Sequence, residues 1–530
     1  YVEGDAVLDR GNFKNNHSET ESGGGLHCKG NLTLTDTVFI GNTSDSEGGG
    51  ARVDGNATVS GGHFENNHND FFEGGGLDVA GNLVMTNTVF ISNTAEYLGG
   101  GARVGGNATL YGGRFEANSS LDLGGGLGVN GALIMVNTNF VSNDAVGGGG
   151  GAWVEGEVTL TGGLFKNNQA CCGGGLAGGG NLTIYKTKFI SNTSTYGGGG
   201  AGTIGNAYVT GGLFENNRID NNTGGGLSVE GNMILTDTVF INNTARSNSS
   251  GGGASALGDI ILIGGHFENN HSDTYGGGLI LWHGSLALTD TVFISNTADL
   301  GSGAARVERG TFLNNGRFVN NTSGGAGGGL NIWGGELFVN ATQFINNSAQ
   351  TVGGGMFLAG DTSGRIVNTL FARNNANNVA GLTSHSTGSI DILHATFAGE
   401  PTSNGQAIYI ALSTIGITNS IFAEYPTGIA ADGTTTVHED YNLFSNVNIP
   451  TSGSTIVSGG NSFVGDPKFL NPALDDYRIG LHSQALDAGV DAGVFVDFEG
   501  DPRPLNQGFD IGFDEVVVRF LYLPVIQRTP

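Results

Sequence analysis

The chain has 530 residues, of which 98 are Gly and only 13% are charged, and this composition is unlike that of a helical or α/β protein. Gly is the poorest helix former after Pro, and Asn, Thr, Val, Ile and Phe favour turns and strands, so we expect an all-β fold. The formal net charge of −27 argues against nucleic acid and anionic membranes as partners, and no apolar run approaches the ~20 residues of a membrane-spanning helix.

A repeat with two landmarks runs through most of the chain. The pattern F-x-x-N recurs every 24 to 27 residues from Phe13 to Phe371, and a Gly cluster followed by an apolar residue lies between successive copies. Within one period the residues alternate as they do in strands: Leu26 and Cys28 share a face with Phe39. Three short strands joined by Gly-rich or Asn-rich corners make one coil of a single-stranded right-handed parallel β-helix. We predict a regular solenoid over residues 1–375, with ~25 residues per coil.

The two landmarks also predict the interior of this solenoid. Stacked Phe rings from successive coils should supply most of the core. The Asn three residues after each Phe should turn inward and hydrogen-bond to the Asn above and below it. Gly at the sharpest corner permits positive φ and close approach of the backbone. The predicted structural ladder begins with Phe39, Asn42, Phe64, Asn67, Phe90 and Asn93.

The octapeptide GGHFENNH occurs at residues 61–68 and 264–271 and raises the question of a metal or catalytic site. Its first His, His63 or His266, is replaced by Arg or Leu in other coils, and its Glu becomes Lys166 in one of them. A position that varies this freely within one protein belongs to a solvated face. We therefore predict that the octapeptide is scaffold, and that the repeats hold no catalytic, cofactor-binding or metal-binding residues.

Two other repeat folds share some of these features. A leucine-rich repeat has a similar period, but its return segment is usually helical or 3₁₀, whereas here that segment is Gly-rich. The Ca²⁺-binding nonapeptide roll needs GGxGxD repeats, which are absent from this sequence. The parallel β-helix is therefore the expected fold.

The pairing of GG[AGL] and an apolar residue with F-x-x-N, as in GGGLHCKGN followed by FIGN, resembles the repeats of polymorphic outer-membrane proteins and related right-handed parallel β-helix surface proteins. The resemblance covers residues 1 to about 375. It implies a bacterial protein that is secreted and extracellular, with an adhesive or structural role at the cell surface.

The regular Gly clusters end near residue 360, and the pattern loosens beyond it. We expect less regular coils over 376–440, a capping or anchor-like module over 441–516 and a strand tail over 517–530. The stretch GDPKFLNPALDDYRIGLHSQALDAGV is similar to the C-terminal module of many secreted bacterial β-helix proteins, sometimes called a choice-of-anchor domain. That resemblance brings no catalytic residues with it.

A dense group of carboxylates surrounds Arg503 in this module. Carboxylate oxygens that converge from turns suit Ca²⁺, so Asp497, Asp501 and Asp510 are candidate ligands. The alternative, which we favour, is a closing cap in which Arg503 pairs with one or two carboxylates. No other cofactor is expected.

Several surface residues are candidates for contact with carbohydrate. Trp282 and Trp333 take the same outward place in GGGLILWHG and GGGLNIWGG, where they stack on sugars or are incidental surface aromatics.

Cys171 and Cys172 are expected to be free thiols, with a strained vicinal disulfide as the alternative. The candidate glycosylation sites are the sequons at Asn31, Asn56, Asn107, Asn181 and Asn340.

The first residues, YVEGDAVLDRGNFKNN, align without gaps on residues 153–168, so the sequence begins inside a coil. An open coil exposes unpaired backbone groups. We hypothesise that Phe520, Tyr522 and Val525 of one molecule complete the coil that contains Tyr1 and Val2 in the next, which gives a head-to-tail filament. The alternative is that a capping segment precedes Tyr1 in the native protein.

An enzyme must also be considered, because right-handed β-helices include pectin lyases and polygalacturonases, whose sites need converging carboxylates. The candidate row in this sequence is broken by Asn and Lys: Asp36, Asn87, Asn137, Lys186, Asp237 and Asp290. We therefore predict a non-catalytic, secreted structural or adhesive solenoid that binds itself and cell-surface polysaccharide. The alternative is a carbohydrate-binding or polysaccharide-cleaving protein.

Overall fold

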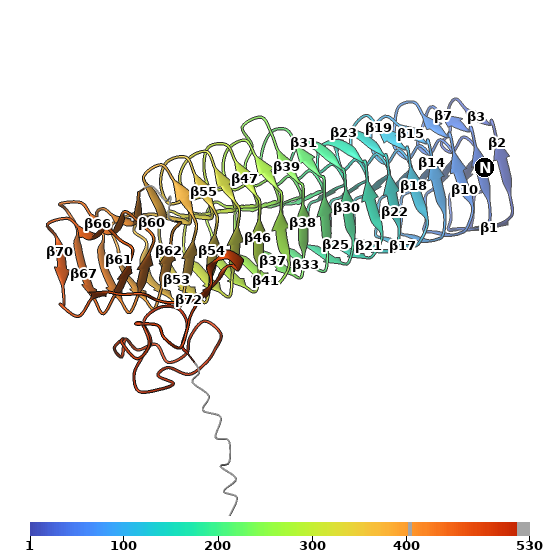
Figure 1. Ribbon diagram of the computed structural model, residues 1–530. Coiled ribbons are helices and arrows are strands. Elements are labelled where there is room, and N and C mark those ends of the chain that lie inside the picture. Colours follow the sequence, from blue (N-terminus) through green and yellow to red (C-terminus); the bar gives the residue numbers. More distant parts are fainter. Residues whose placement is uncertain (401–404, 517–530) are drawn as a thin grey trace, which may run out of the picture. The chain divides into compact units, whose positions relative to one another are not determined.

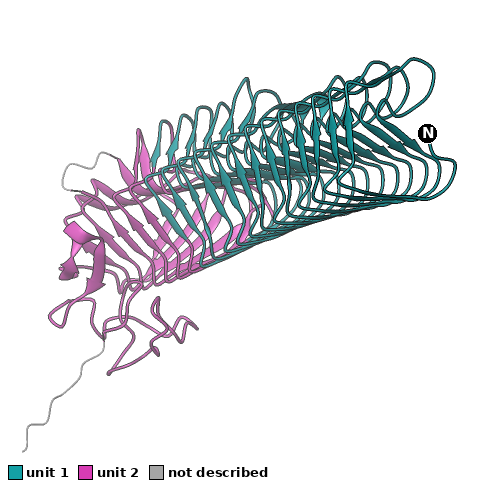
Figure 2. Ribbon diagram, turned by 90° about the vertical axis from the view of Figure 1, so that its right-hand side faces the viewer, with its two compact units in different colours: residues 1–311, 317–332, 348–350 teal, residues 312–316, 333–347, 351–530 magenta. Residues whose placement is uncertain are grey.

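The computed structural model describes residues 1–400 and 405–516 (Figure 1). These residues form about 18 coils of a parallel β-solenoid with about 25 residues per coil, so the predicted all-β solenoid is confirmed. Helix among them is limited to one 3₁₀ turn, η1 (Pro472–Leu474), and none is long and apolar enough to cross a membrane. The chain divides into two compact units (Figure 2): unit 1 comprises residues 1–311, 317–332 and 348–350, and unit 2 comprises the other described residues.

Most coils of unit 1 have four strands, whereas the sequence predicts three. The fourth strand escaped prediction because it has only two residues in most coils and follows directly after the ladder Asn. Equivalent strands of successive coils pair in parallel and in register, with Leu77 opposite Ala102 and Phe90 opposite Phe115. In one coil the four strands are β12 (Leu77–Val79), β13 (Leu83–Thr86), β14 (Val89–Ile91) and β15 (Thr94–Ala95).

A stack of Phe rings fills the interior of unit 1. Phe39 in β6 (Val38–Ile40), Phe64 in β10 (His63–Glu65) and Phe90 in β14 are register partners, and all three are fully buried. Their ring centroids lie 4.7 Å apart, and neighbouring rings are within 6° of parallel. This spacing is that of paired strands, so the strand register itself places each ring on the next.

A ladder of buried Asn side chains runs beside the Phe stack. Nδ2 of Asn67 donates to Oδ1 of Asn93 at 2.9 Å and to the carbonyl of Phe39 at 2.9 Å. Oδ1 of Asn67 accepts the backbone N–H and Nδ2 of Asn42, at 3.1 and 2.9 Å. Each amide is thus satisfied by protein alone, as full burial requires. The same pattern of side-chain bonds recurs at Asn93, Asn118, Asn143, Asn168, Asn192, Asn217 and Asn243.

Two kinds of corner alternate before the Phe strands of successive coils in unit 1. One kind has Asn or Asp followed by Thr, as in Asn87-Thr88, and the other has two Gly residues, as in Gly112-Gly113. The side chain of the first kind lies close to the Gly of the second. Asn87, at the corner after β13, has a positive φ of 51°. Its side chain lies against Gly112 of the next coil, where an added Cβ would sit 2.2 Å from Asn87 Oδ1. Gly112 also has a positive φ, of 66°. The corners of Asp36, Asn137 and Asp237 are likewise followed by Gly in the next coil, whereas Asp290 is followed by Asn315, whose φ is 54°.

Unit 2 consists of coils that end with β71 (Phe463–Val464) and of a covering segment, residues 466–516. Coil strands such as β68 (Leu443–Ser445) continue into the range 441–516, for which the sequence predicts a capping or anchor-like module. The predicted strand over 517–530, with Phe520, Tyr522 and Val525, lies outside the described residues.

The covering segment packs against the side of the coils of unit 2. It contains the antiparallel pair β72 (Phe469–Asn471) and β73 (Asp476–Ile479). Ile479 and Ile511 join a hydrophobic cluster with Ile421 and Leu443 of the coils. In β65 (Ile421–Ala423) all three residues are buried, whereas in β14 only the central Phe is. The looser sequence pattern of this region therefore belongs to coils that are apolar on both faces.

Candidate functional site

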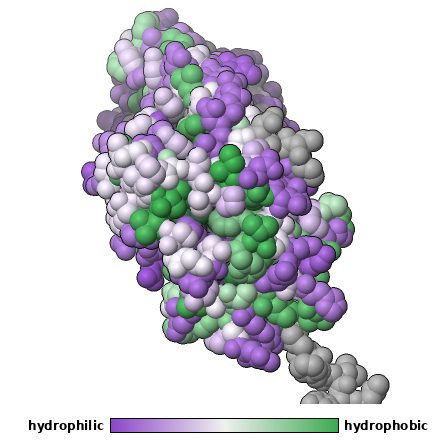
Figure 3. Space-filling view, turned by 60° about the vertical axis from the view of Figure 1, so that its left-hand side comes forward, coloured by the Kyte–Doolittle hydropathy of each residue, from purple (hydrophilic) through white to green (hydrophobic). Residues whose placement is uncertain are grey.

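The outer surface mixes polar and apolar side chains. On the face drawn in Figure 3, apolar side chains form small groups that polar side chains separate. The exposed apolar residues of unit 2 include Val464, Leu474, Leu481 and Phe495. Scattered exposure of this kind is normal for a protein surface, so candidate sites must be sought in specific groups of side chains.

The carboxylates around Arg503 form a buried network in unit 2. Nη1 of Arg503 donates to Oε2 of Glu515 at 2.7 Å, and neither side chain is exposed. Arg503 also donates to the carbonyls of Asp510 and Gly512, at 3.2 and 2.9 Å. Burial raises the pKa of Asp510 to about 6. Burial also lowers the pKa of Arg503, although the negative charges of the nearby carboxylates act in the opposite direction. Arg503 thus holds several turns of the covering segment together.

Two of the three candidate Ca²⁺ ligands direct their oxygens at backbone N–H groups. Oδ1 of Asp497 accepts the N–H groups of Glu499 and Asp501, and Oδ2 accepts a third. Both oxygens of Asp510 likewise accept backbone N–H groups. Oxygens engaged in this way stabilise turns, so the geometry favours the structural interpretation over a Ca²⁺ site.

A buried His links the covering segment to the coils. Nδ1 of His394 lies 3.2 Å from the carbonyl of Asp510, and Nδ2 of Asn419 donates to Nε2 of His394 at 3.0 Å. Burial and the nearby Arg503 hold the pKa of His394 well below its usual range. The neutral ring therefore donates through Nδ1–H and accepts at Nε2, which is a structural role.

The two predicted carbohydrate contacts have different surroundings. Trp282, after β44 (Leu279–Leu281) of unit 1, is half-buried, and the guanidinium of Arg306 lies 6.0 Å from its ring centroid. The same guanidinium lies 4.4 Å from the ring of Tyr275, so Arg306 occupies the space beside both rings. Trp333, in unit 2, is 46% exposed. Trp333 is therefore the better placed of the two to meet a sugar.

Trp333 belongs to a row of aromatic rings that continues through three successive coils of unit 2. Its ring centroid lies 6.4 Å from that of Phe357 in β56 (Met356–Gly360). Phe357 lies 5.4 Å from His385 in β60 (Val379–Ser386), and His385 lies 6.0 Å from Tyr409 in β63 (Gln406–Ile410). Trp333 and His385 are exposed and Tyr409 is half-buried. The four rings form the aromatic row.

A hollow of about 600 Å³ lies beside this row. Its lining includes His385 and Tyr409, together with the amide side chains of Asn377, Asn378 and Gln406. Oε1 of Gln406 is buried and has no hydrogen-bond partner among the described residues. Aromatic faces beside amide donors and acceptors suit the alternating apolar faces and hydroxyls of a sugar chain.

Four of the five candidate glycosylation sites, Asn31, Asn56, Asn107 and Asn181, lie in a second, outer ladder of Asn side chains. Oδ1 of Asn31 accepts the N–H of Asn56 at 3.0 Å, and Oδ1 of Asn56 accepts the N–H of Asn82 at 2.9 Å. Asn107 continues this ladder, and Asn181 accepts the N–H of Asn206 at 3.0 Å in a later part. Sequence reasoning missed this ladder, although the Gly-Asn pair after each first strand signals it.

Asn31, Asn56 and Asn107 are exposed, whereas Asn181 and Asn340 are half-buried. Nδ2 of Asn340 donates to Asn314 at 2.9 Å. Because a glycan would attach at Nδ2, the first three are the more accessible acceptors.

The carboxylate and amide row considered for catalysis occupies the left-handed corner described above. Its six members, one per pair of coils, have φ between 45° and 55°. The Oδ1 atoms of Asp36, Asn137 and Asp237 lie against Gly61, Gly162 and Gly264 of the following coils. All six residues of this row are nevertheless exposed. The row comprises Asp36, Asn87, Asn137, Lys186, Asp237 and Asp290.

Cys171 and Cys172 are free thiols in β27 (Gln169–Cys172), with their sulfur atoms 3.8 Å apart. Burial raises the pKa of Cys172 to about 11. The thiol is therefore a poor nucleophile at neutral pH.

One group of three His, Cys, Asp or Glu side chains among the described residues brings its ligand atoms within 4.8 Å of one another: His271, Asp273 and Asp299. Sequence reasoning assigned His271 to scaffold as part of the octapeptide, and it did not consider the two Asp residues.

No known protein family matches the chain, and no curated protein matches its sequence. The resemblances to polymorphic outer-membrane protein repeats and to a choice-of-anchor module therefore stay predictions.

Proposed function

We propose that the protein is a non-catalytic, extracellular solenoid with a structural and adhesive role. The observation that supports this most directly is the interior of unit 1, where each Phe ring stacks on the next and each buried Asn bonds to the next. A coil can leave this stack only when its strand pairing, its ring contacts and its amide bonds break together. Such a body resists extension and presents the same outer positions many times.

The use of the charged groups supports a non-catalytic role. The exposed corner row is interrupted by Asn87, Asn137 and Lys186, and the carboxylates of Asp497 and Asp510 accept backbone N–H groups. Glycoside hydrolysis needs two carboxyl groups that face one substrate across a defined gap.

Single-molecule stretching tests the structural role. If coils detach one at a time, each of about 25 residues, the extension should grow in steps of about 85 Å, at about 3.4 Å per residue. A single step that releases all coils together would contradict coil-by-coil resistance. The variant Asn118→Ala should lower the force of the steps near its coil, and the exposed Asn107→Ala should not.

Head-to-tail assembly of the solenoid forms part of the proposal. It requires that the native chain begin at the coil that contains Tyr1 and Val2. Mass spectrometry of the native N-terminus tests this requirement, and electron microscopy over a range of concentrations tests the assembly itself. Fibres with an axial repeat of one molecule support assembly, and single particles at every concentration exclude it.

Carbohydrate binding is a second candidate function, which the aromatic row and the adjoining hollow favour. Truncation of Trp333 or Tyr409 to Ala should weaken binding to an immobilised polysaccharide about 3- to 10-fold, because an aromatic contact contributes about 0.5–1.5 kcal/mol. Phe338→Ala is a matched control, since Phe338 is 42% exposed but lies in β53 (Glu336–Asn340), outside the row. Equal binding by all three variants would remove this candidate, and release of new sugar ends would identify an enzyme.

A further inference from the structure

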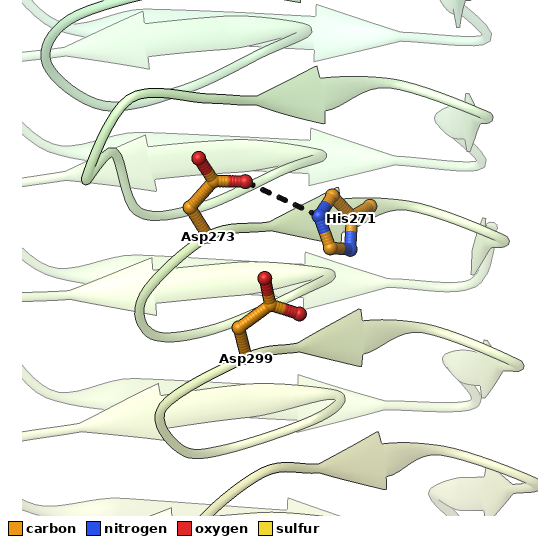
Figure 4. A group of neighbouring side chains, drawn as sticks. All are labelled: His271, Asp273 and Asp299. Atoms are coloured by element: carbon orange, nitrogen blue, oxygen red, sulfur yellow. Dashed lines mark hydrogen bonds and ion pairs between the residues drawn. The ribbon is translucent and has the colours of Figure 1, made fainter.

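The group of His271, Asp273 and Asp299 spans two adjacent coils of unit 1. His271 lies in β43 (His271–Ser272), and its register partner is Thr297 in β47 (Thr297–Ala298). Asp273 and Asp299 each follow two residues later, so the register places them at equivalent positions of neighbouring coils. Figure 4 shows the His271 ring facing Asp273 while Asp299 approaches from the next coil. Their ligand atoms lie within 4.8 Å of one another.

Neighbouring groups hold two of these side chains in place. Nδ1 of His271 lies 2.9 Å from the hydroxyl of Thr297, and Nε2 faces Oδ1 of Asp273 at 3.3 Å. Oδ2 of Asp273 accepts the backbone N–H of Ser247 at 2.6 Å, which leaves Oδ1 toward the ring. A His that donates through one ring nitrogen to a fixed partner and presents the other to a carboxylate has the orientation usual for metal-binding His.

We propose that His271, Asp273 and Asp299 bind a divalent transition cation of the Zn²⁺ class. An imidazole nitrogen beside two carboxylates suits Zn²⁺, whereas Ca²⁺ and Mg²⁺ prefer oxygen ligands alone. In the bound form the lone pair of Nε2 holds the ion, and the single ring proton lies on Nδ1 and is donated to the hydroxyl of Thr297. Two carboxylates balance the charge of the ion, and the fourth position of a tetrahedral site takes a water molecule.

The distances fit this ion after one small movement. Bonds of about 2.0–2.1 Å in a tetrahedral Zn²⁺ site place neighbouring ligand atoms about 3.3–3.4 Å apart. Nε2 of His271 and Oδ1 of Asp273 already have this separation, at 3.3 Å. Asp299 is exposed, so its carboxylate is free to turn inward by the remaining distance. Arg246, at the equivalent place of the preceding coil, makes no ion pair with Asp273 among the described residues.

The first copy of the octapeptide provides an internal comparison. His68 pairs with Asp70 at 2.9 Å and bonds to Thr94, as His271 pairs with Asp273 and bonds to Thr297. The place of Asp299 is taken there by Glu96, and the described residues of that coil pair contain no group of three converging ligands. The two copies should therefore differ in their affinity for the ion.

Calorimetric titration of Zn²⁺ into the full chain, with Cys171 and Cys172 replaced by Ser because thiols bind zinc, tests the proposal. His271→Gln should weaken the tightest site more than about 100-fold, and Asp299→Asn more than about 10-fold. Thr297→Val, which removes only the supporting hydroxyl, should weaken it about 10-fold. The matched control is His266→Gln, since His266 lies in the same coil but faces one carboxylate, that of Glu268 at 3.7 Å.

Circular dichroism of each variant checks that the coils are intact, which we expect because the three side chains are at least partly exposed. The proposal is overturned if His271→Gln keeps the affinity and stoichiometry of the parent, or if the parent binds no Zn²⁺ in a one-to-one ratio. Loss of the tightest site in Asp70→Asn, with Asp273→Asn unchanged, would also overturn it by moving the site to the other copy.

Discussion

The buried Asn ladder of unit 1 gives the sharpest test of the fold. Asn118 lies in the middle of the ladder and is fully buried. Its Oδ1 accepts the backbone N–H and Nδ2 of Asn93, at 3.0 and 2.9 Å. Its Nδ2 donates to the carbonyl of Phe90 and to Oδ1 of Asn143, both at 3.0 Å. One side chain thus joins three coils.

Asn118→Ala removes these bonds and leaves two buried donors of Asn93 without an acceptor. Each such donor costs about 1–3 kcal/mol, so the free energy of unfolding should fall by about 2–6 kcal/mol. Asn118→Asp keeps the shape and the acceptor but places an oxygen opposite the Phe90 carbonyl, so it should destabilise the protein at least as much. Asn107→Ala is the matched control, because the exposed Asn107 accepts one N–H, from Ala132 at 2.9 Å, and its loss should cost about 1 kcal/mol or less.

Urea unfolding followed by far-ultraviolet circular dichroism measures these differences, and amide hydrogen exchange locates them. Exchange should quicken most in the coils that contain Asn93, Asn118 and Asn143. The reasoning is refuted if Asn118→Ala lowers the unfolding midpoint no more than Asn107→Ala does, because the buried ladder would then contribute nothing beyond the outer one.

Two further predictions concern a corner and a buried carboxyl group. Gly112→Ala should lower the free energy of unfolding by about 1–3 kcal/mol, because φ at Gly112 is 66° and the new Cβ would sit 2.2 Å from Asn87 Oδ1. Adding Asn87→Gly should partly restore the thermal unfolding temperature. No recovery in the double variant would contradict the steric explanation. Burial raises the pKa of Asp514 to about 7, so the folded state keeps a proton that the unfolded state loses near pH 4. The free energy of unfolding should therefore fall as the pH rises from about 4 to about 7, and Asp514→Asn should flatten this slope. Urea midpoints at pH 5 and pH 8 measure it, and an unchanged slope in the variant would show that another group is responsible.

Regular spacing made the interior predictable. In a stacked fold, a Phe and an Asn at fixed offsets in each period must lie above the same residues of the preceding coil. The repeat therefore predicted both the Phe stack and the buried Asn ladder. The fourth strand was missed because two residues carry too little pattern to register as a strand. The outer ladder was missed because Asn in Gly-Asn pairs is also the usual residue of an ordinary turn.

The covering segment was harder to predict for a different reason. Its position depends on contacts between residues far apart in the chain, such as Asn368 with Val496 and Asn419 with Val490. No periodicity links such residues, so the sequence predicted a closing cap and an acidic cluster but not the side of the coils on which they pack.

The candidate sites show what a search along a single coil overlooks. Trp333, Phe357, His385 and Tyr409 form one row although they do not share one repeat position: Phe357 and Tyr409 both pair with Thr383, and His385 lies two residues after Thr383. Asp273 and Asp299 are 26 positions apart in sequence, yet both approach His271. In a solenoid, one period of separation along the chain is contact distance in space. Variation of the first His of the octapeptide therefore says nothing about its last His, His271, because the partners of His271 lie outside the octapeptide: Asp273 in the same coil and Asp299 in the next.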